Sequence, residues 1–171
     1  MEYYNKNKFA YLPKKPVKTF QDLEVYQQAL AANVFAINTI ATSFDGQSKK
    51  TKSKNESWEN EVKEIKTMII KTLINCACAI PHEIAEAHSF RFGVQKECLV
   101  LLEKVMLNCN KMVVYLDQAR DICATGVEVE KFEELQKKYL FIRRKVLNLQ
   151  RSWQKYMGMP QGEKYFKNVN L

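Results

Sequence analysis

The feature that most constrains this chain is an unbroken alternation of three- and four-residue steps between apolar side chains near its C-terminus. Such spacing places all of these residues on one face of an α-helix and is typical of coiled-coil packing. It predicts a long helix that follows Gly126 and ends at the sequence Met159-Pro160-Gln161-Gly162. The predicted seam consists of Phe132, Leu135, Tyr139, Ile142, Val146, Leu149 and Trp153.

Helical spacing recurs in three earlier segments. The first opens at Thr19 with a capping box that pairs it with Asp22, and it stops at Asp45-Gly46. The second starts near Ser57, where we expect Pro81 to kink or split it, and the third covers residues 94–123. Their predicted seams are Phe20, Leu23, Tyr26, Leu30, Val34, Ile37 and Phe44, then Trp58, Val62, Ile65, Ile69, Leu73, Cys76 and Ile80, and then Cys98, Leu101, Val105, Cys109, Met112, Leu116 and Ala119.

Turn-forming residues are scarce, with only 5 Gly and 4 Pro among 171 residues, and this argues against an all-β fold. Hydrophobic residues make up 46% of the chain, as in ordinary globular proteins. Four long helices with short connections predict an all-α, up-and-down antiparallel four-helix bundle. We expect a basic aromatic arm at residues 1–18, the bundle at 19–157 and a short polar tail at 158–171.

The sequence indicates a cytoplasmic protein without a membrane partner. The first 18 residues carry charges and contain no apolar core of the kind that a secretory signal needs. No stretch approaches the ~18 uncharged apolar residues of a membrane span. The five cysteines are odd in number and lie in helical, mostly apolar runs, which favours buried thiols in a reducing compartment. They are Cys76, Cys78, Cys98, Cys109 and Cys123.

One cluster, in the sequence IPHEIAEAHSF, resembles a half-site for a metal. It contains His82, Glu83, Glu86 and His88, and no other histidine exists in the chain. We interpret the glutamates as capping or hydrogen-bonding groups near Pro81 and the histidines as surface groups, since a metal site needs more ligands. A metal site at this cluster is the alternative. We expect no metal, no cofactor and no enzyme activity.

Nucleophilic catalysis has one weak candidate, Cys78 with His82 one turn further along the helix. A cysteine nucleophile needs an adjacent base, but cysteines buried in apolar helices are inert. Cys76 and Cys78 lie two residues apart, on nearly opposite sides of a helix, so they cannot chelate one ion together. We therefore expect no catalytic residue.

The net charge of +8 and the pI near 9.2 favour a polyanionic partner. In the last helix, basic residues with one aromatic recur on the side opposite the seam. Glu128, Glu130, Glu133 and Glu134 precede them, so matching of the helix dipole is an equal alternative to a binding face. The candidate residues are Lys137, Phe141, Arg144, Arg151 and Lys155, with Asn148 between them.

The N-terminal arm interleaves five lysines and one glutamate with four aromatic residues. Lysines contact phosphates and aromatic rings stack on bases, so this composition suits flexible single-stranded nucleic acid. The alternative is a tail whose Phe9 and Tyr11 pack on the bundle. A second basic segment, residues 47–55, is either a further contact or a solvated loop. The candidate lysines of the two segments are Lys14, Lys15, Lys49, Lys50, Lys52 and Lys54.

Several apolar residues lie outside the predicted seams of the last two helices. They indicate either a broad core or a subunit interface, and we predict a homo-oligomer. These residues are Leu99, Val113, Leu140 and Leu147.

Three segments resemble known bacterial four-helix-bundle proteins. The opening Thr19-Phe20-Gln21-Asp22-Leu23-Glu24-Val25-Tyr26 resembles the start of ribosomal-RNA intervening-sequence proteins. Ala79-Ile80-Pro81 followed by Ile84-Ala85-Glu86 is similar to their Ser-Ile-Pro-x-Asn-Ile-Ala-Glu-Gly element. The segment from Arg144 to Trp153 resembles the end of the last helix in their relatives, the accessory variability proteins of diversity-generating retroelements. The resemblance spans residues 19–157.

The chain departs from this pattern at Ile74 and Asn75, where the family has paired arginines, and at Glu83 and Ala87, where it has Asn and Gly. The resemblance implies a bundle that assembles into a ring, commonly a pentamer, with a positively charged surface. It also implies a reverse transcriptase and its RNA as partners. We therefore expect a non-catalytic nucleic-acid-binding accessory protein, or else a scaffold bundle without a nucleic-acid role.

Overall fold

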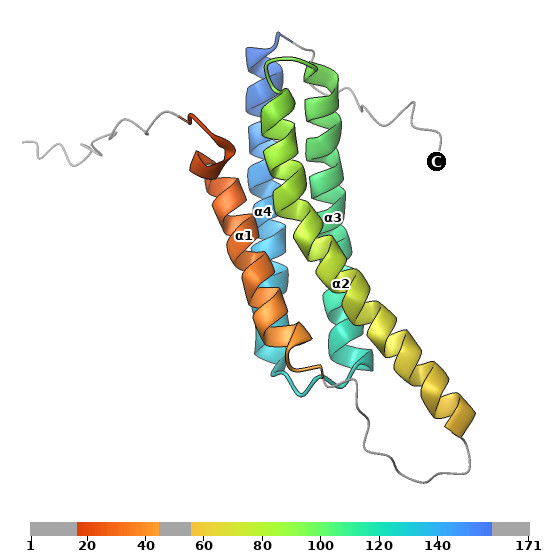
Figure 1. Cartoon of the computed structure of the whole chain (residues 1–171). Coiled ribbons are helices and arrows are strands. Elements are labelled where there is room, and N and C mark those ends of the chain that lie inside the picture. The colour runs from red at the N-terminus through yellow and green to blue at the C-terminus, as the bar shows by residue number, and fades with distance from the viewer. Residues whose placement is uncertain (1–16, 45–55, 159–171) are drawn as a thin grey trace, which may run out of the picture.

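A computed structural model describes residues 17–44 and 56–158, which form an all-α, up-and-down four-helix bundle (Figure 1). Each long helix packs against the next one in the chain, and the first also packs against the last. The predicted fold class is confirmed. The elements are the 3₁₀ turn η1 (Phe20–Asp22), α1 (Glu24–Ala36), the π-helical turn η2 (Ile37–Ala41), α2 (Glu56–Phe90), α3 (Gln95–Ile122) and α4 (Val129–Tyr156).

The predicted capping box at Thr19 and Asp22 is present, although it opens η1 rather than a full α-helix. The Asp22 carboxylate accepts hydrogen bonds from the backbone N–H groups of Thr19 at 2.8 Å and Lys18 at 3.0 Å. These two bonds favour the ionised carboxylate and hold the pKa of Asp22 below its usual value. The entry of the chain into the bundle is thereby fixed.

Pro81 is buried inside α2 and does not split that helix. Proline has no backbone N–H, so the helix loses the hydrogen bond to the carbonyl of residue 77. Figure 1 shows that the axis of α2 changes direction in its middle stretch, in agreement with the predicted kink.

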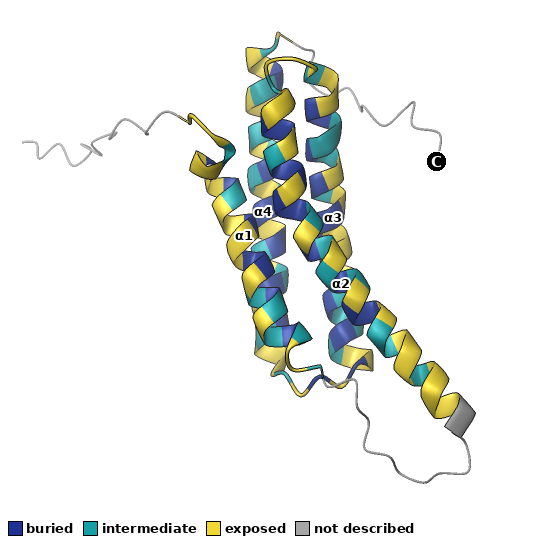
Figure 2. Cartoon of the chain, in the orientation of Figure 1, coloured by how far each residue is buried: buried dark blue, intermediate teal, exposed yellow. Residues whose placement is uncertain are grey.

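The core is built from the inward faces of all four helices (Figure 2). The α4 seam is confirmed from Phe132 to Val146, where every predicted residue is at most 1% exposed. Further along, Leu149 and Trp153 are only partly buried, while Gln150 and Gln154 are buried.

The α3 seam is also confirmed, except that Leu102 occupies the central position predicted for Leu101. Leu99 lies outside the predicted seam and is fully buried, so at this position the core is broader than the seam alone.

The predicted seam of the first helix is confirmed at Leu23, which is buried, and is wrong at two positions of α1. Leu30 and Val34 are 42% and 49% exposed. Three alanines instead face the core, because small side chains allow α1 to approach α2 and α4 closely. The observed buried residues are Val25, Ala29, Ala32, Asn33 and Ala36, followed by Ile40 in η2.

The first turns of α2 diverge from the other helices, as Figure 1 shows. The seam residues Trp58 and Ile65 are therefore 64% and 47% exposed, although their helical spacing was predicted correctly. From Ile69 onward the same face is buried, except that Cys76 is only partly buried.

One helical stretch, Trp58–Phe90, has the length and composition of a membrane span, with a mean hydropathy of 1.2 in its most apolar window of 18 residues. This differs from the expectation that no stretch would come near that level. Half of the window is buried inside the bundle, as in the core helix of a helical protein.

Candidate nucleic-acid interface

The outer face of α4 carries an exposed line of four basic residues, Lys137, Arg144, Arg151 and Lys155. We call them the basic line. These residues lie on the side of α4 opposite its buried seam. Because the apolar seam packs against the core, all four basic side chains face solvent. With a rise of 1.5 Å per residue, the line is about 27 Å long. Phe141 and Asn148 are exposed on the same face.

The two halves of the basic line differ in their ion pairs. Lys137 lies 3.5 Å from Glu133, and its neighbour Lys138 lies 2.8 Å from Glu134. In the described part of the chain, no ion pair joins Arg144, Arg151 or Lys155 to a carboxylate. The C-terminal half of α4 therefore has cations whose charge is not neutralised within the bundle.

Phe141 is only partly available to a ligand. The Lys145 ammonium lies 5.1 Å from the centre of its ring, and Glu24 of α1 accepts hydrogen bonds from the same ammonium at 3.0 and 3.1 Å. Because Glu24 holds this cation over Phe141, one face of the ring is already in contact with a charge.

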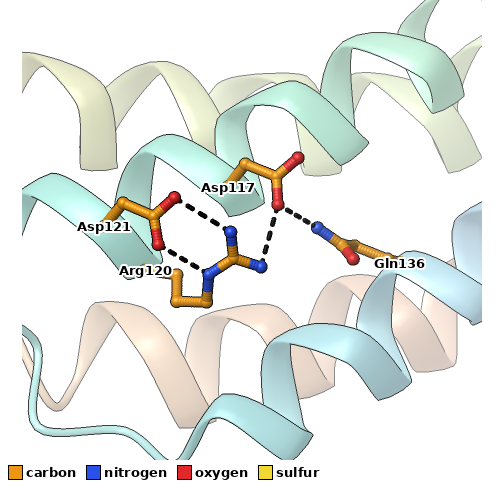
Figure 3. A network of polar contacts seen from close by, with 4 residues as sticks. All are labelled: Asp117, Arg120, Asp121 and Gln136. Carbon is orange, nitrogen blue, oxygen red and sulfur yellow. Dashed lines mark hydrogen bonds and ion pairs between the residues drawn. The ribbon is translucent and has the colours of Figure 1, made fainter.

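Arg120 belongs to a structural network at the junction of α3 and α4 (Figure 3). Its guanidinium donates two hydrogen bonds to Asp121, at 2.7 and 2.9 Å, and forms an ion pair with Asp117 at 3.0 Å. Gln136 of α4 donates to the same Asp117 carboxylate at 2.7 Å. The guanidinium lowers the pKa of Asp121 through its hydrogen bonds. The charge of this arginine is thus neutralised within α3, and the Gln136–Asp117 hydrogen bond links the network to α4.

A second glutamine of α4, two heptads after Gln136 and therefore on the same side of the helix, also binds α3. Fourteen residues after Gln136, the Gln150 amide donates to the Leu99 carbonyl at 3.4 Å and to Glu103 at 3.5 Å. Together with the Gln136 bond, these contacts fix the antiparallel register of the two helices. The orientation of the basic line is fixed with it, since α4 cannot rotate without breaking them.

The cluster around Pro81 is divided between the surface and the interior. His82 and Glu86 are exposed. Glu83 is 4% exposed, and its carboxylate accepts hydrogen bonds from the Asn108 amide at 2.9 and 3.2 Å and pairs with Lys104 at 3.1 Å. Glu83 therefore bridges α2 and α3 rather than capping the chain near Pro81.

His88 corrects the expectation that both histidines are surface groups. It is 9% exposed, and its ring centre lies 6.3 Å from that of Trp153. Burial, and secondly the charge of Arg91, lower its pKa. Among the described residues, no group of three or more His, Cys, Asp or Glu side chains is arranged to hold a metal ion.

Three of the five cysteines are buried as predicted, Cys76 is partly buried and Cys78 is exposed. Burial raises the pKa of Cys76 to about 11 and those of Cys98 and Cys109 to about 12. These thiols are protonated at neutral pH and are poor nucleophiles. Cys78 lies 3.6 Å from the Asn33 side chain of α1, on the other side of α2 from Cys76.

The remaining candidate lysines lie outside the described residues. They are Lys14 and Lys15 of the arm and Lys49, Lys50, Lys52 and Lys54 of the linker.

Sequence reasoning missed a second group of exposed residues, at the end of the bundle where α4 terminates. Phe92 in the α2–α3 turn is 72% exposed, and Tyr156 at the end of α4 is 79% exposed. The Arg91 guanidinium lies 4.4 Å from the centre of the Phe92 ring. The run Phe90-Arg91-Phe92 in a turn was the available signal, but periodicity analysis does not detect residues in turns.

No family profile, curated protein or solved structure matches this chain.

Proposed function

We propose that this chain is a non-catalytic, cytoplasmic nucleic-acid-binding protein and that α4 presents its binding face. By resemblance, we further propose that it belongs to the intervening-sequence and accessory variability proteins. Its partners would then be a reverse transcriptase and the RNA of a diversity-generating retroelement.

The observation that carries this proposal is the basic line of α4. Dipole matching favours bases near a helix C-terminus, but it does not select the outward side. Arg144, Arg151 and Lys155 are nevertheless aligned on that side and have no carboxylate partner in the described structure. Unneutralised cations in a row attract the phosphates of a nucleic acid, which lie in a row themselves.

The test reverses two charges of this line. The double variant Arg144→Glu and Arg151→Glu should abolish binding of a fluorescently labelled 20-nucleotide RNA, measured by anisotropy at low salt. For the unchanged protein, the logarithm of affinity should fall with the logarithm of salt concentration, by about 0.7 per phosphate contacted on a single strand. An affinity that does not depend on salt would contradict the proposal.

The matched control is the double variant Lys63→Glu and Lys71→Glu. Both lysines are exposed on α2, and the two reversals lower the net charge of +8 by the same four units. If both double variants lose binding equally, net charge alone attracts the RNA and α4 is not the site.

A deletion separates the arm from α4. Residues 1–16 can be removed without touching the backbone N–H of Lys18, which donates to Asp22. If the deletion abolishes RNA binding and the Arg144/Arg151 variant binds normally, the arm is the site.

The alternative function is that of a scaffold bundle without a nucleic-acid role. The outward residues Leu30 and Val34 of α1 favour protein contacts, because they border an apolar surface depression formed with Gln27 and Phe35. Failure of the purified protein to shift any nucleic acid at low salt would favour this function.

We also propose a homo-oligomer, with a pentamer favoured by resemblance. Leu140 is 48% exposed, and Leu107 and Val114 on the outer side of α3 are 44% and 53% exposed. Apolar side chains of this size outside the core are typical of subunit interfaces. Light scattering at micromolar concentration should give a mass above that of the 20.0 kDa monomer, and a monomer mass would contradict the proposal.

A further inference from the structure

The α2–α3 turn and the end of α4 lie at the same end of the bundle (Figure 1). Exposed aromatic residues and bases occur together there. Phe92 and Tyr156 are the most exposed of the large hydrophobic side chains in the described structure. Arg91 contacts the Phe92 ring and also lies within electrostatic range of Tyr156. Lys155 is exposed beside Tyr156. We call these four residues the tip.

The surroundings of the tip are basic. Residues 90–97 and 151–158 together contain four bases, Arg91, Lys96, Arg151 and Lys155, and one acid, Glu97. Two of these bases also belong to the basic line, so the charged face of α4 runs without interruption into the tip. A ligand bound to the line therefore reaches the aromatic rings.

We propose that the tip is a base-stacking site and that the ligand is single-stranded nucleic acid rather than a duplex. This inference rests on the proposed function of α4 and specifies its ligand. In a duplex the base faces are covered by neighbouring bases, whereas a single strand can place a base on an aromatic ring. Arg91 adds a guanidinium plane and a positive charge beside such a base.

An anionic membrane is the other ligand that basic residues and exposed rings attract, but it fits the geometry less well. The basic line extends along the side of α4 for about 27 Å from the tip. A flat surface that contacts the end of the bundle does not also contact Lys137 and Arg144 on its side. A flexible strand follows both surfaces, so the arrangement favours nucleic acid.

The test removes the aromatic faces and keeps the apolar character. In the full chain, the double variant Phe92→Leu and Tyr156→Leu should weaken binding of a 20-nucleotide oligouridylate by about ten-fold per ring lost. Binding of a blunt 20-base-pair duplex should not change, and neither should the salt dependence, because no phosphate contact is removed. Phe92→Trp and Tyr156→Phe should retain full affinity. An unchanged unfolding midpoint checks that the variants fold.

A direct readout is photocrosslinking of an oligouridylate that contains 5-iodouracil. Stacked rings should crosslink, and mass spectrometry should place the crosslinks at Phe92 or Tyr156. Crosslinks confined to other residues would overturn the inference.

The outcomes separate this inference from the function on which it rests. If Arg144→Glu with Arg151→Glu abolishes binding and the leucine variant binds oligouridylate normally, the tip is not a stacking site and the function of α4 stands. If the unchanged protein binds no oligonucleotide, both fail. If the leucine variant loses binding only to phosphatidylserine vesicles, the tip is a membrane contact and the inference is wrong.

Discussion

The helices α1 and α4 are neighbours in the bundle, yet they place their apolar side chains in opposite ways. In α4 the large residues Phe132, Tyr139 and Ile142 are buried, and charged residues face solvent. In α1 the buried face consists largely of alanines, while the larger Leu30 and Val34 lie outside. Burial of large side chains supplies most of the hydrophobic stabilisation, so α4 anchors the core and α1 covers it.

The difference shows that burial follows from the whole helix surface and not from the hydrophobicity of single residues. In α4, arginine and lysine exclude one side from the core and leave only one orientation. In α1 no such residues oppose the choice, and close packing against α2 and α4 selects the small side chains. Leu30 and Val34 are then left exposed on the outer side of α1, without a partner inside the described bundle.

The largest effect should come from α4. Replacing the buried Ile142 by alanine should destabilise the protein by about 2–5 kcal/mol, since it removes apolar contacts and leaves a cavity. Arg144→Ala, two residues away on the exposed side, should change the free energy of unfolding by at most about 0.5 kcal/mol. Urea denaturation measures both, and similar values for the two variants would contradict the one-sided description of α4.

A smaller effect is expected from the alanine face of α1. Ala32 is 1% exposed, so Ala32→Leu should overpack the contact and destabilise the fold by about 1–3 kcal/mol. Leu30→Ala on the outer side should cost no more than about 0.5 kcal/mol in the monomer. If Leu30→Ala proves the more costly of the two, Leu30 faces the core as the seam predicted and the alanine face does not.

The smallest effect on stability should come from the polar groups that α1 and α4 bury. The Asn33 side chain of α1 lies 3.6 Å from the Cys78 thiol, whereas the fully buried Tyr139 hydroxyl of α4 has no hydrogen-bond partner among the described residues. Burial raises the pKa of Tyr139, so this hydroxyl stays protonated. Tyr139→Phe should therefore stabilise the protein by about 1 kcal/mol in thermal or urea unfolding.

The control for this substitution is Tyr115→Phe, at a partly buried tyrosine of α3. Unlike the Tyr139 hydroxyl, the Tyr115 hydroxyl is not a buried group that lacks a partner. Its removal should therefore hardly change the free energy of unfolding. A loss of stability in Tyr139→Phe would mean that its hydroxyl has a partner, such as a buried water molecule.

The fold could be predicted because the boundaries and the faces of α3 and α4 are both encoded locally. Most outward positions of α4 carry polar or charged side chains, so the same helical spacing predicts both the buried seam and the basic line. The orientation of α1 could not be predicted, because Ala32 and Leu30 differ in size more than in polarity. Packing against other helices decided between them.

The exposure of Trp58 also escaped prediction, although its helical face was assigned correctly. Periodicity shows which side of a helix is apolar, but it does not show how far the neighbouring helices extend. The tip was missed for a related reason. Phe92 and Tyr156 are far apart in sequence and lie at the same end of the bundle only because the α2–α3 turn and the end of α4 are both there.

The divergence of the first turns of α2 from the bundle has a consequence for how long its hydrogen bonds persist. Backbone amides around Trp58 and Ile65 belong to a helix with little packing, so they open by local fraying at low free-energy cost. Amides near Leu73 and Ile84 open only when the bundle itself unfolds, because these residues are completely buried. Within one continuous helix, deuterium uptake should therefore change from fast to slow, and the position of this change marks where the cooperatively unfolding part of α2 begins.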